Sequence, residues 1–238
     1  MPSIELSGQV IVYSVRSSKR AKRIFLNLSP GKGLELVYPA GLQALAPETL
    51  LRQKSDWILA AINRLNDKVQ SLPTREYKDG EEFLLRGARL ELKLIPMPGR
   101  DIVMVEPAAG LLKVSHPPSP RREDIRAAIE SFYHENAKAY LPRRLHELAK
   151  MHGFRYEGVR VKNQKTRWGS CSAKRNINLN MRLMMAPDDA IDYVIIHELC
   201  HLRELHHNKA FWALVESLCP DYRHWKAWFK RHGPSLIL

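Results

Sequence analysis

The sequence predicts an α+β protein, with a β-rich N-terminal region that includes one helix and a largely helical C-terminal domain that includes a small sheet. Short runs rich in β-branched and aromatic residues, separated by turn residues, fill the first half and are typical of strands. After residue 123 the apolar residues recur with a helical period instead. The stretch "PPSPRRED" lies between these patterns, so we place a linker at 116–122 and divide the chain into regions 1–118 and 119–238.

The first part of the chain is expected to form a small sheet and one helix. The candidate strands are 10–16, 23–29 and 34–39, which are short, apolar and bounded by turn signals such as "SPGKG". A helix is expected over 46–69, because Pro47 favours a first helical turn and the apolar residues after it have helical spacing.

Two hairpins are expected next. "EFLLRGARLELKLIP" has Gly87 between two apolar runs, and the segments 101–107 and 111–117 flank "AAG" in the same way. Glycine accepts the positive φ that a tight two-residue hairpin turn requires. The β-rich character therefore continues up to the linker.

The C-terminal region is expected to hold several helices around two strands. The first helix spans 123–153 and ends at Gly153, since glycine is common just beyond a helix C-terminus. Two strands follow within 160–184, around a tight connection that contains Gly169. The next helix begins near Pro187, with acidic residues in its first turn, as the helix dipole favours. We detect no internal repeat in the sequence.

Composition restricts the class of protein. Apolar residues make up 45% and charged residues 26%, an ordinary mix for a folded domain. No run approaches the roughly 20 apolar residues of a membrane-spanning helix, and the N-terminus lacks the pattern of a secretory signal, so we expect no membrane partner. The three cysteines argue against a disulfide framework and fit a reducing compartment. We therefore expect a cytoplasmic protein.

The net charge of +13 favours an anionic partner. Basic residues cluster at 16–23, 120–126 and 159–167, and the first of these segments contains no aromatic residue on which bases could stack. Nucleic acid is therefore a partner to test, through the basic surface. A dispersed, solubilising positive charge explains the composition equally well.

The stretch "IDYVIIHELCHLRELHHNKAFW" contains an HExxH motif over 197–201. Residues four apart lie on one face of a helix, so His197 and His201 can bind the same ion while Glu198 lies beside them. The apolar stripe of this segment points more than roughly 100° away from the two histidines. We expect a helix that buries one side and presents its histidines to a cleft. Two hydrogen-bonded histidines on an ordinary helix are the alternative.

A catalytic zinc ion usually takes three protein ligands and keeps one position for water. The candidates for the third ligand are His206, His207 and Glu216. On one continuous helix, His207 would lie about 15 Å from His197 along the axis, too far to share an ion.

The chain must therefore turn after the second histidine if His207 is a ligand. Asn208 is a suitable N-cap for a new helix over 209–219, which favours a break between Leu202 and Asn208. We favour His207 as the third ligand, with His206 exposed on the turn and Glu216 as a lesser alternative.

The sequence resembles the YgjP-like metallopeptidase family, in the zincin neighbourhood that includes the WLM and SprT-like proteins. "AKRIFLNLSP" is similar to the family's basic N-terminal strand, "KTRWGSCSAKRNINLNMRLMMAP" to its RWGSC block, "IDYVIIHELCHL" with "HHNKAFW" to its zinc motif, and "PDYRHWKAW" to its closing helix. The resemblance covers nearly the whole chain. It implies a zincin-like metal-binding catalytic domain over 119–238 with one Zn²⁺ per chain.

The resemblance also implies a substrate-binding strand. In zincins a strand usually runs along the cleft and pairs with an extended substrate backbone. "VRVKNQKTRWGSCS" is the candidate: Arg167 and Trp168 would line the cleft, and Gly169 would let a backbone approach closely. Ser170 completes the expected substrate-binding set. The alternative is a structural turn beside the helix, with Trp168 in the core.

The expected function is metal-assisted hydrolysis of a peptide bond in a protein or peptide substrate. His197, His201 and His207 would hold Zn²⁺, and Glu198 would take a proton from the zinc-bound water and pass it to the leaving amine. Two alternatives stay open. One is hydrolysis of a nucleotide phosphoanhydride, which suits the basic surplus although the sequence has no glycine-rich phosphate loop. The other is a nucleic-acid-associated protein with a zincin domain, whose zinc acts on DNA-bound proteins or is structural.

Overall fold

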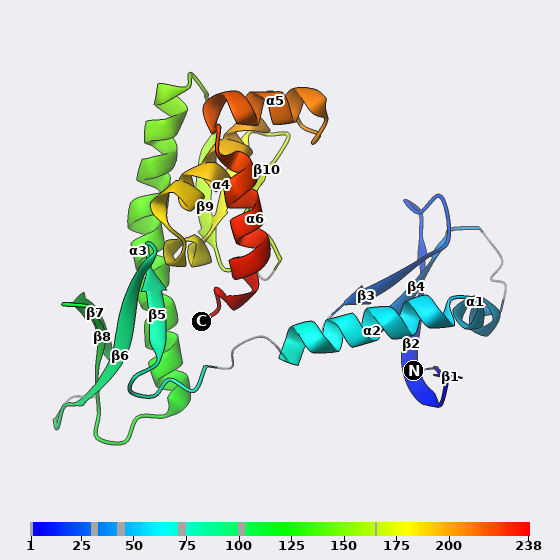
Figure 1. Cartoon of the computed structure of the whole chain (residues 1–238), viewed down its shortest axis with the longest axis horizontal. Helices are drawn as coiled ribbons and strands as arrows, with labels where there is room; N and C mark the ends of the chain where they lie inside the picture. The colour runs from blue at the N-terminus through cyan, green and yellow to red at the C-terminus, as the bar shows by residue number, and fades with distance from the viewer. Residues whose placement is uncertain (1, 30–32, 42–45, 71–74, 100–102, 165) are drawn as a thin grey trace. The chain divides into compact units, whose positions relative to one another are not determined.

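The chain divides into two compact units, Met1–Pro73 (unit 1) and Thr74–Leu238 (unit 2) (Figure 1). Both units combine strands and helices, which confirms the predicted α+β class. The computed structural model describes residues 2–29, 33–41, 46–70, 75–99, 103–164 and 166–238, and of 66–70 the backbone alone.

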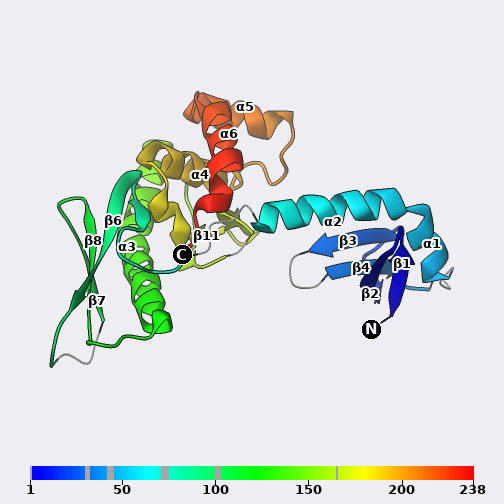
Figure 2. The ribbon, with the colours of Figure 1, turned by 60° about the horizontal axis from the view of Figure 1, so that its bottom comes forward.

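Unit 1 is a four-stranded sheet with two helices on one face (Figure 2). Its strands are β1 (Ser3–Leu6), β2 (Gln9–Ser18), β3 (Phe25–Ser29) and β4 (Gly33–Pro39), in the order β1-β2-β4-β3. The central strands β2 and β4 run parallel, and the two outer pairs are antiparallel. The helices α1 (Pro47–Gln53) and α2 (Ser55–Gln70) bury Leu51 and Ile58 against the alternating apolar residues of the sheet.

The three predicted strands of unit 1 are present, with two differences from the prediction. Strand β1 was not predicted, because its four residues are too short to show a clear period. The single helix predicted over 46–69 breaks at Lys54, which leaves the helical region (φ −109°, ψ 16°) and separates α1 from α2.

Unit 2 begins with a sheet of the same topology. Its strands are β5 (Glu82–Leu85), β6 (Ala88–Pro96), β7 (Met104–Ala108) and β8 (Leu111–His116), in the order β5-β6-β8-β7. Both predicted hairpins are confirmed, and the first turns through Arg86 and Gly87, at φ 50° and 80°. As in unit 1, the central pair is parallel. Two hairpins followed by a helix therefore occur twice, a repeat that only the strand pairing reveals.

The helix α3 (Arg122–Met151) covers this second sheet. Its buried side chains join those of the strands in one core, and the hydroxyl of Tyr133 donates to the carbonyl of Leu84 at 2.5 Å. The predicted linker at 116–122 is therefore the connection between β8 and α3 inside unit 2. The division predicted after residue 118 differs from the observed one, because the apolar face of β5–β8 is buried by α3 and not by the strands before it.

The rest of unit 2 combines a small sheet with three helices. These elements are β9 (Gly158–Lys162), β10 (Gly169–Cys171), β11 (Asn176–Asn180), α4 (Asp188–Cys200), α5 (Lys209–Leu218) and α6 (Tyr222–His232), with short 3-10 turns at Met181–Met185 (η1) and Gly233–Ser235. The sheet order is β10-β11-β9, so three strands stand where two were predicted. Gly169 opens the edge strand β10 and does not lie in a tight connection. Among the described residues, no helix is long and apolar enough to cross a membrane.

The first hairpin of unit 2 is anchored at the start of α4. The backbone N–H of Arg86 donates to the carbonyl of Met184 at 2.6 Å, and its guanidinium pairs with Asp188 at 2.7 Å. Gly87 lies so close to Pro187 that an added Cβ would be 3.2 Å from the proline Cα. These contacts fix the N-terminus of α4, the helix that carries the first histidines of the motif.

Candidate metal centre

Helix α4 presents two imidazoles on one side and apolar residues on the other. His197 lies in its last turn, and His201 follows as the C-cap with helical backbone angles (φ −63°, ψ −15°). The ring centroids of the two histidines are 5.0 Å apart. Ile195 and Leu199 are fully buried in the core. The one-sided arrangement predicted from the motif is confirmed.

The chain turns sharply after α4 and brings a third imidazole back to the first. Asn208 caps α5, as its side-chain oxygen accepts from the backbone N–H of Phe211 at 2.8 Å. The turn places Nε2 of His207 2.9 Å from Nε2 of His197. One ligand atom from each of His197, His201 and His207 lies within 4.8 Å of the others, so the three could hold a metal ion.

The two other candidates for a third ligand are directed elsewhere. His206 is exposed beside His207 and does not belong to the converging group. A carboxylate oxygen of Glu216 accepts from the guanidinium of Arg223 at 2.6 Å. His207 is therefore the residue that completes the triad.

The chemistry of the triad suits a metal ion with nitrogen ligands. Burial, and then the neighbouring His201 and His207, lower the pKa of His197 to about 3, and burial also lowers the pKa values of the other two rings. All three imidazoles are therefore neutral at physiological pH and keep a lone pair. Nδ1–H of His201 donates to the carbonyl of Glu204 at 3.0 Å, which leaves its Nε2 as the free ligand atom. Two facing Nε2 atoms, as in His197 and His207, need a proton or a cation between them.

Glu198 is buried beside the triad and fills the space where a side chain of Gly169 would stand. A Cβ added to Gly169 would lie 2.6 Å from Oε1 and 2.7 Å from Cγ of Glu198. Burial raises the pKa of this carboxyl to about 8, and the charge of Arg167 opposes the shift. The approach of a substrate backbone at Gly169 stays a prediction, and in the structure it is the side chain of Glu198 that lies against this glycine.

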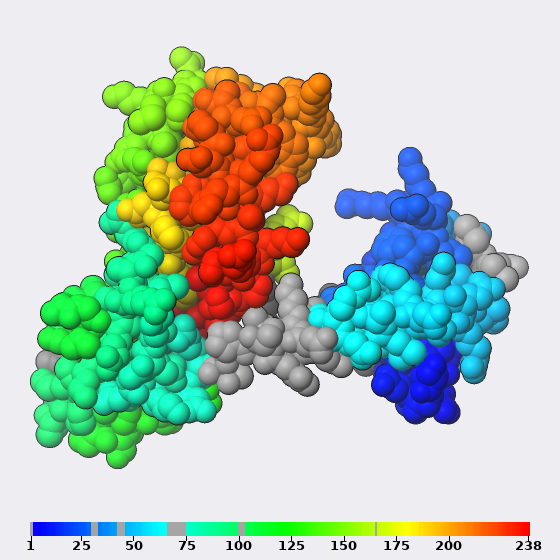
Figure 3. Space-filling view, viewed as in Figure 1, coloured from blue at the N-terminus to red at the C-terminus, as the bar shows by residue number. Residues whose placement is uncertain are grey.

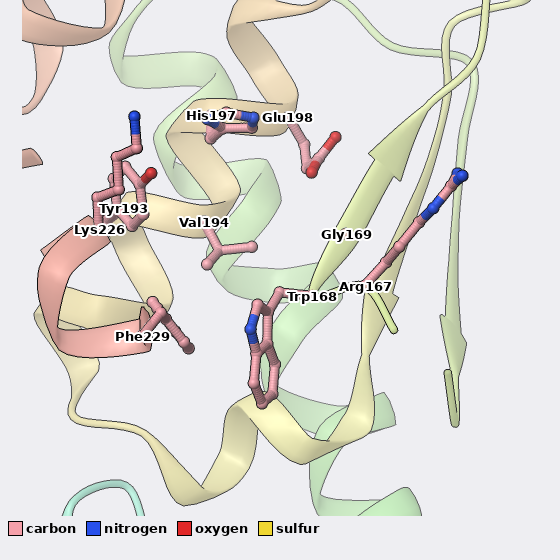
Figure 4. Close-up of a pocket in the computed structure, with 9 residues that line it drawn as sticks. All are labelled: Arg167, Trp168, Gly169, Tyr193, Val194, His197, Glu198, Lys226 and Phe229. Atoms are coloured by element: carbon pink, nitrogen blue, oxygen red, sulfur yellow. The ribbon is translucent and has the colours of Figure 1, made fainter. Parts of the chain in front are cut away.

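A pocket of about 270 Å³ opens beside His197 and Glu198 (Figure 4). It is lined by Arg167, Trp168, Gly169, Tyr193, Val194, His197, Glu198, Lys226 and Phe229. Figure 4 shows Arg167 and Lys226 on opposite sides of this pocket. Three of the four predicted substrate-binding residues thus reach the pocket. The exception is Ser170, whose hydroxyl accepts from the side-chain amide of Asn178 at 3.1 Å.

Trp168 combines the two roles that the sequence left open. It lines the pocket and is half-buried, with its ring centroid 5.0 Å from that of Phe229. Its far edge lies 3.1 Å from the position of a Cβ on Gly233, and the guanidinium of Arg182 lies over the ring at 5.3 Å. The indole therefore joins the pocket wall to the core.

Sequence reasoning missed several residues that shape this pocket. Tyr193 precedes the motif by one helical turn, and the spacing that identified the histidines could have indicated it. Lys226 and Phe229 come from α6, about thirty residues later, and no local signal connects them to α4.

Asn180 was also missed, and it holds the segment that leads into β10. Its buried side-chain amide donates to the carbonyls of Gln164 and Arg167, both at 2.7 Å. Its backbone N–H donates to the carbonyl of Trp168 at 2.8 Å. The side chain of Asn180 thereby fixes Arg167, and its backbone fixes Trp168, beside the pocket.

Three comparisons relate the chain to known proteins. Over 65 residues, or 27% of the chain, the sequence is 32% identical to a UTP pyrophosphatase of Escherichia coli (strain K12), and the match spans 39% of that protein's length. The crystal structure of the metallopeptidase zymogen of Pyrococcus abyssi abylysin is similar at a TM-score of 0.36 with 21% identity, over 41% of this chain and 99% of that one. The YgjP-like metallopeptidase domain matches residues 22–232, and the chain therefore belongs to the YgjP-like family.

Proposed function

We propose that the chain is a zinc-dependent hydrolase, a metallopeptidase that cleaves peptide bonds with an activated water. The observation that carries this proposal is the convergence of three neutral imidazoles beside a buried carboxyl group. Three histidines from α4 and the following turn form a ligand set typical of a catalytic zinc ion, which keeps its fourth position open.

The chain's own residues would then divide the chemistry between them. When bound, Zn²⁺ supplies a Lewis acid and lowers the pKa of a coordinated water. Glu198 is the general base, which takes the proton of the attacking water and returns it to the leaving group. The carboxyl group of Glu198 can occupy its position because Gly169 has no side chain that would collide with it. Arg167, which lowers the pKa of Glu198 against the effect of burial, favours the ionised form of the base.

A peptide substrate is favoured by the strand beside the pocket. β10 lies at the edge of its sheet, and Gly169 at its start lines the pocket. An extended peptide could pair with the main chain of such an edge while its scissile carbonyl faces Glu198. The metallopeptidase domain of the family supports the same substrate class.

Hydrolysis of a nucleotide phosphoanhydride is the second candidate. Arg167 and Lys226 line the pocket on opposite sides, and two cations beside a metal centre suit a polyphosphate (Figure 4). A partial relative is named UTP pyrophosphatase. The same three histidines and Glu198 would serve this reaction.

One experiment separates these functions. Purified protein and its Glu198→Gln variant are analysed for zinc and assayed on casein and on nucleoside triphosphates. We expect about one zinc per chain in both proteins and casein hydrolysis by the wild type alone. Turnover of the triphosphates without proteolysis would establish the second candidate. Equal turnover by both proteins would remove Glu198 from the mechanism.

A further inference from the structure

Unit 1 carries an apolar groove between the edge strand β3 and the helix α2. Two hollows of about 310 and 370 Å³ share Leu26 and Trp57 and together form this groove. Leu28 and Leu65 also line it, together with the charged side chains of Lys54 and Arg64. Helix α2 forms much of the face of unit 1 seen in Figure 3.

The groove has the architecture of a site for strand addition. β3 pairs with β4 on one side only, and alternate main-chain groups of an edge strand point away from its neighbour. An extended peptide that pairs with this free edge places alternate side chains against the adjacent helix. Trp57 of α2, exposed by 46%, is suited to hold such side chains.

Charge indicates which peptide fits. Lys54 and Arg64 line the groove, and neither has an acidic partner among the described residues. Residues 1–73 contain ten lysines and arginines against five acidic residues, and the basic segment 16–23 leads directly into β3. This surplus of positive charge favours a partner with acidic side chains.

The repeat inside the chain supplies a comparison. The equivalent position in unit 2, between β7 and α3, holds a hollow of about 410 Å³. Its charged lining residue is Glu135, and its aromatic residue Phe132 packs on the core of unit 2. The two units thus have the same backbone arrangement at this position, but only the groove of unit 1 has basic and exposed aromatic side chains. This difference is expected if the groove of unit 1 has a specific function.

We propose that the β3–α2 groove binds an extended, acidic segment of another protein as an added strand. Apolar side chains of that segment lie against Trp57 and Leu26, and its carboxylates lie near Lys54 and Arg64. The main chain pairs with β3. This binding is independent of hydrolysis and goes beyond the proposed function.

The test uses the full chain with Glu198→Gln, so that a bound peptide is not cleaved. A labelled peptide of about ten residues carries leucine and glutamate in turn at every second position, with serine between them, so that both face the groove; it is titrated by fluorescence anisotropy. We expect saturable binding that Trp57→Ala weakens by at least roughly tenfold, and that Lys54→Glu with Arg64→Glu weakens similarly. The matched controls, Met151→Ala and Lys150→Glu at the exposed end of α3, should bind as the parent does.

Two further peptides test the pairing itself. They carry N-methyl groups on one or the other set of alternate residues, so their side chains are unchanged. Strand addition predicts that one of them loses at least roughly tenfold in affinity while the other binds normally, because only one set of N–H groups faces β3. Equal affinity of both peptides would overturn the proposal.

Two other results would also overturn it. If single-stranded DNA binds more tightly than the acidic peptide and loses affinity in Trp57→Ala, the groove is a nucleic-acid site. If the chain dimerises and the charge-reversed variant, Lys54→Glu with Arg64→Glu, does not, a second copy of the chain occupies the groove. The charge-reversed variant changes exposed residues only, so it keeps the test valid if Trp57→Ala fails to fold.

Discussion

The carboxyl group of Glu198 lies where a side chain on Gly169 would stand, with Oε1 2.6 Å from the position of the missing Cβ. The helix that carries two of the candidate metal ligands and the strand beside the pocket are thus in contact through one glycine. Any larger residue at 169 must displace the proposed general base.

Replacement of Gly169 should therefore impair turnover more than metal binding. In Gly169→Ala the carboxyl group of Glu198 must shift, and a displacement of about 1 Å can reduce turnover by roughly 100-fold. We expect a fall of at least about tenfold in kcat with the zinc content unchanged. Gly158→Ala on β9 is the control, because its added Cβ would meet only the exposed side chain of Asn176. Full activity in Gly169→Ala would contradict this role of the glycine.

The neighbouring histidines at 206 and 207 offer a paired test of the ligand set. His207→Ala removes one of three ligands and should weaken zinc affinity by more than about tenfold, a loss larger than that from outer hydrogen bonds alone. His206→Ala removes an exposed imidazole outside the triad and should leave zinc affinity unchanged. Competition with a chelator measures both affinities. The reverse order of effects would assign the third ligand to His206.

Asn180 should stabilise unit 2 through the segment that it holds. Asn180→Ala leaves the carbonyl of Arg167 without its donor, whereas the carbonyl of Gln164 keeps the guanidinium of Arg182, and a buried unsatisfied group costs about 1–3 kcal/mol. Urea unfolding should show a loss of that size, with lower turnover as Arg167 loses its fixed position. Asn176→Ala, at an exposed site on the same strand, should change stability by less than about 0.5 kcal/mol. Similar losses in both variants would mean that Asn180 has no special role.

The contact between Arg86 and Asp188 predicts a pH dependence of stability. Hydrogen bonds from Arg86 lower the pKa of Asp188, and burial opposes this shift. The pKa in the folded protein is thus below that of an unfolded aspartate, near 3.9, so the stabilisation is present above about pH 4 and is lost as the pH falls through the folded pKa.

Asp188→Asn isolates this contribution. At neutral pH the variant should be less stable by about 1 kcal/mol or less, since both partners are 45% exposed. The difference should narrow as the pH falls below about 4. Asp189→Asn is the control from the same helical turn, whose carboxylate has no ion-pair partner among the described residues. A difference that grows on acidification would contradict the assignment.

The core of the site could be predicted from the sequence because it depends on local geometry. Helical spacing places His197, Glu198 and His201 together, and the capping preference of Asn208 locates the turn that returns His207. These signals act within about twenty residues of chain.

The remaining features depend on contacts between distant segments. Lys226 enters the pocket from another helix, and Ser170 turns toward Asn178 because of the pairing of β10 with β11. The boundary between the two units could not be predicted from the sequence, and the segment 116–122 predicted as a linker lies inside unit 2. Only the folded chain shows that α3 buries the second sheet. The repeated topology of the two sheets is likewise visible in strand pairing alone.

The three-histidine zinc site is tested most directly by anomalous diffraction at the zinc absorption edge from crystals of the zinc-loaded protein. We expect one peak about 2.0–2.1 Å from a ring nitrogen of each of His197, His201 and His207, with no fourth protein ligand. A zinc ion bound without His207, or enclosed by four protein ligands, would contradict it.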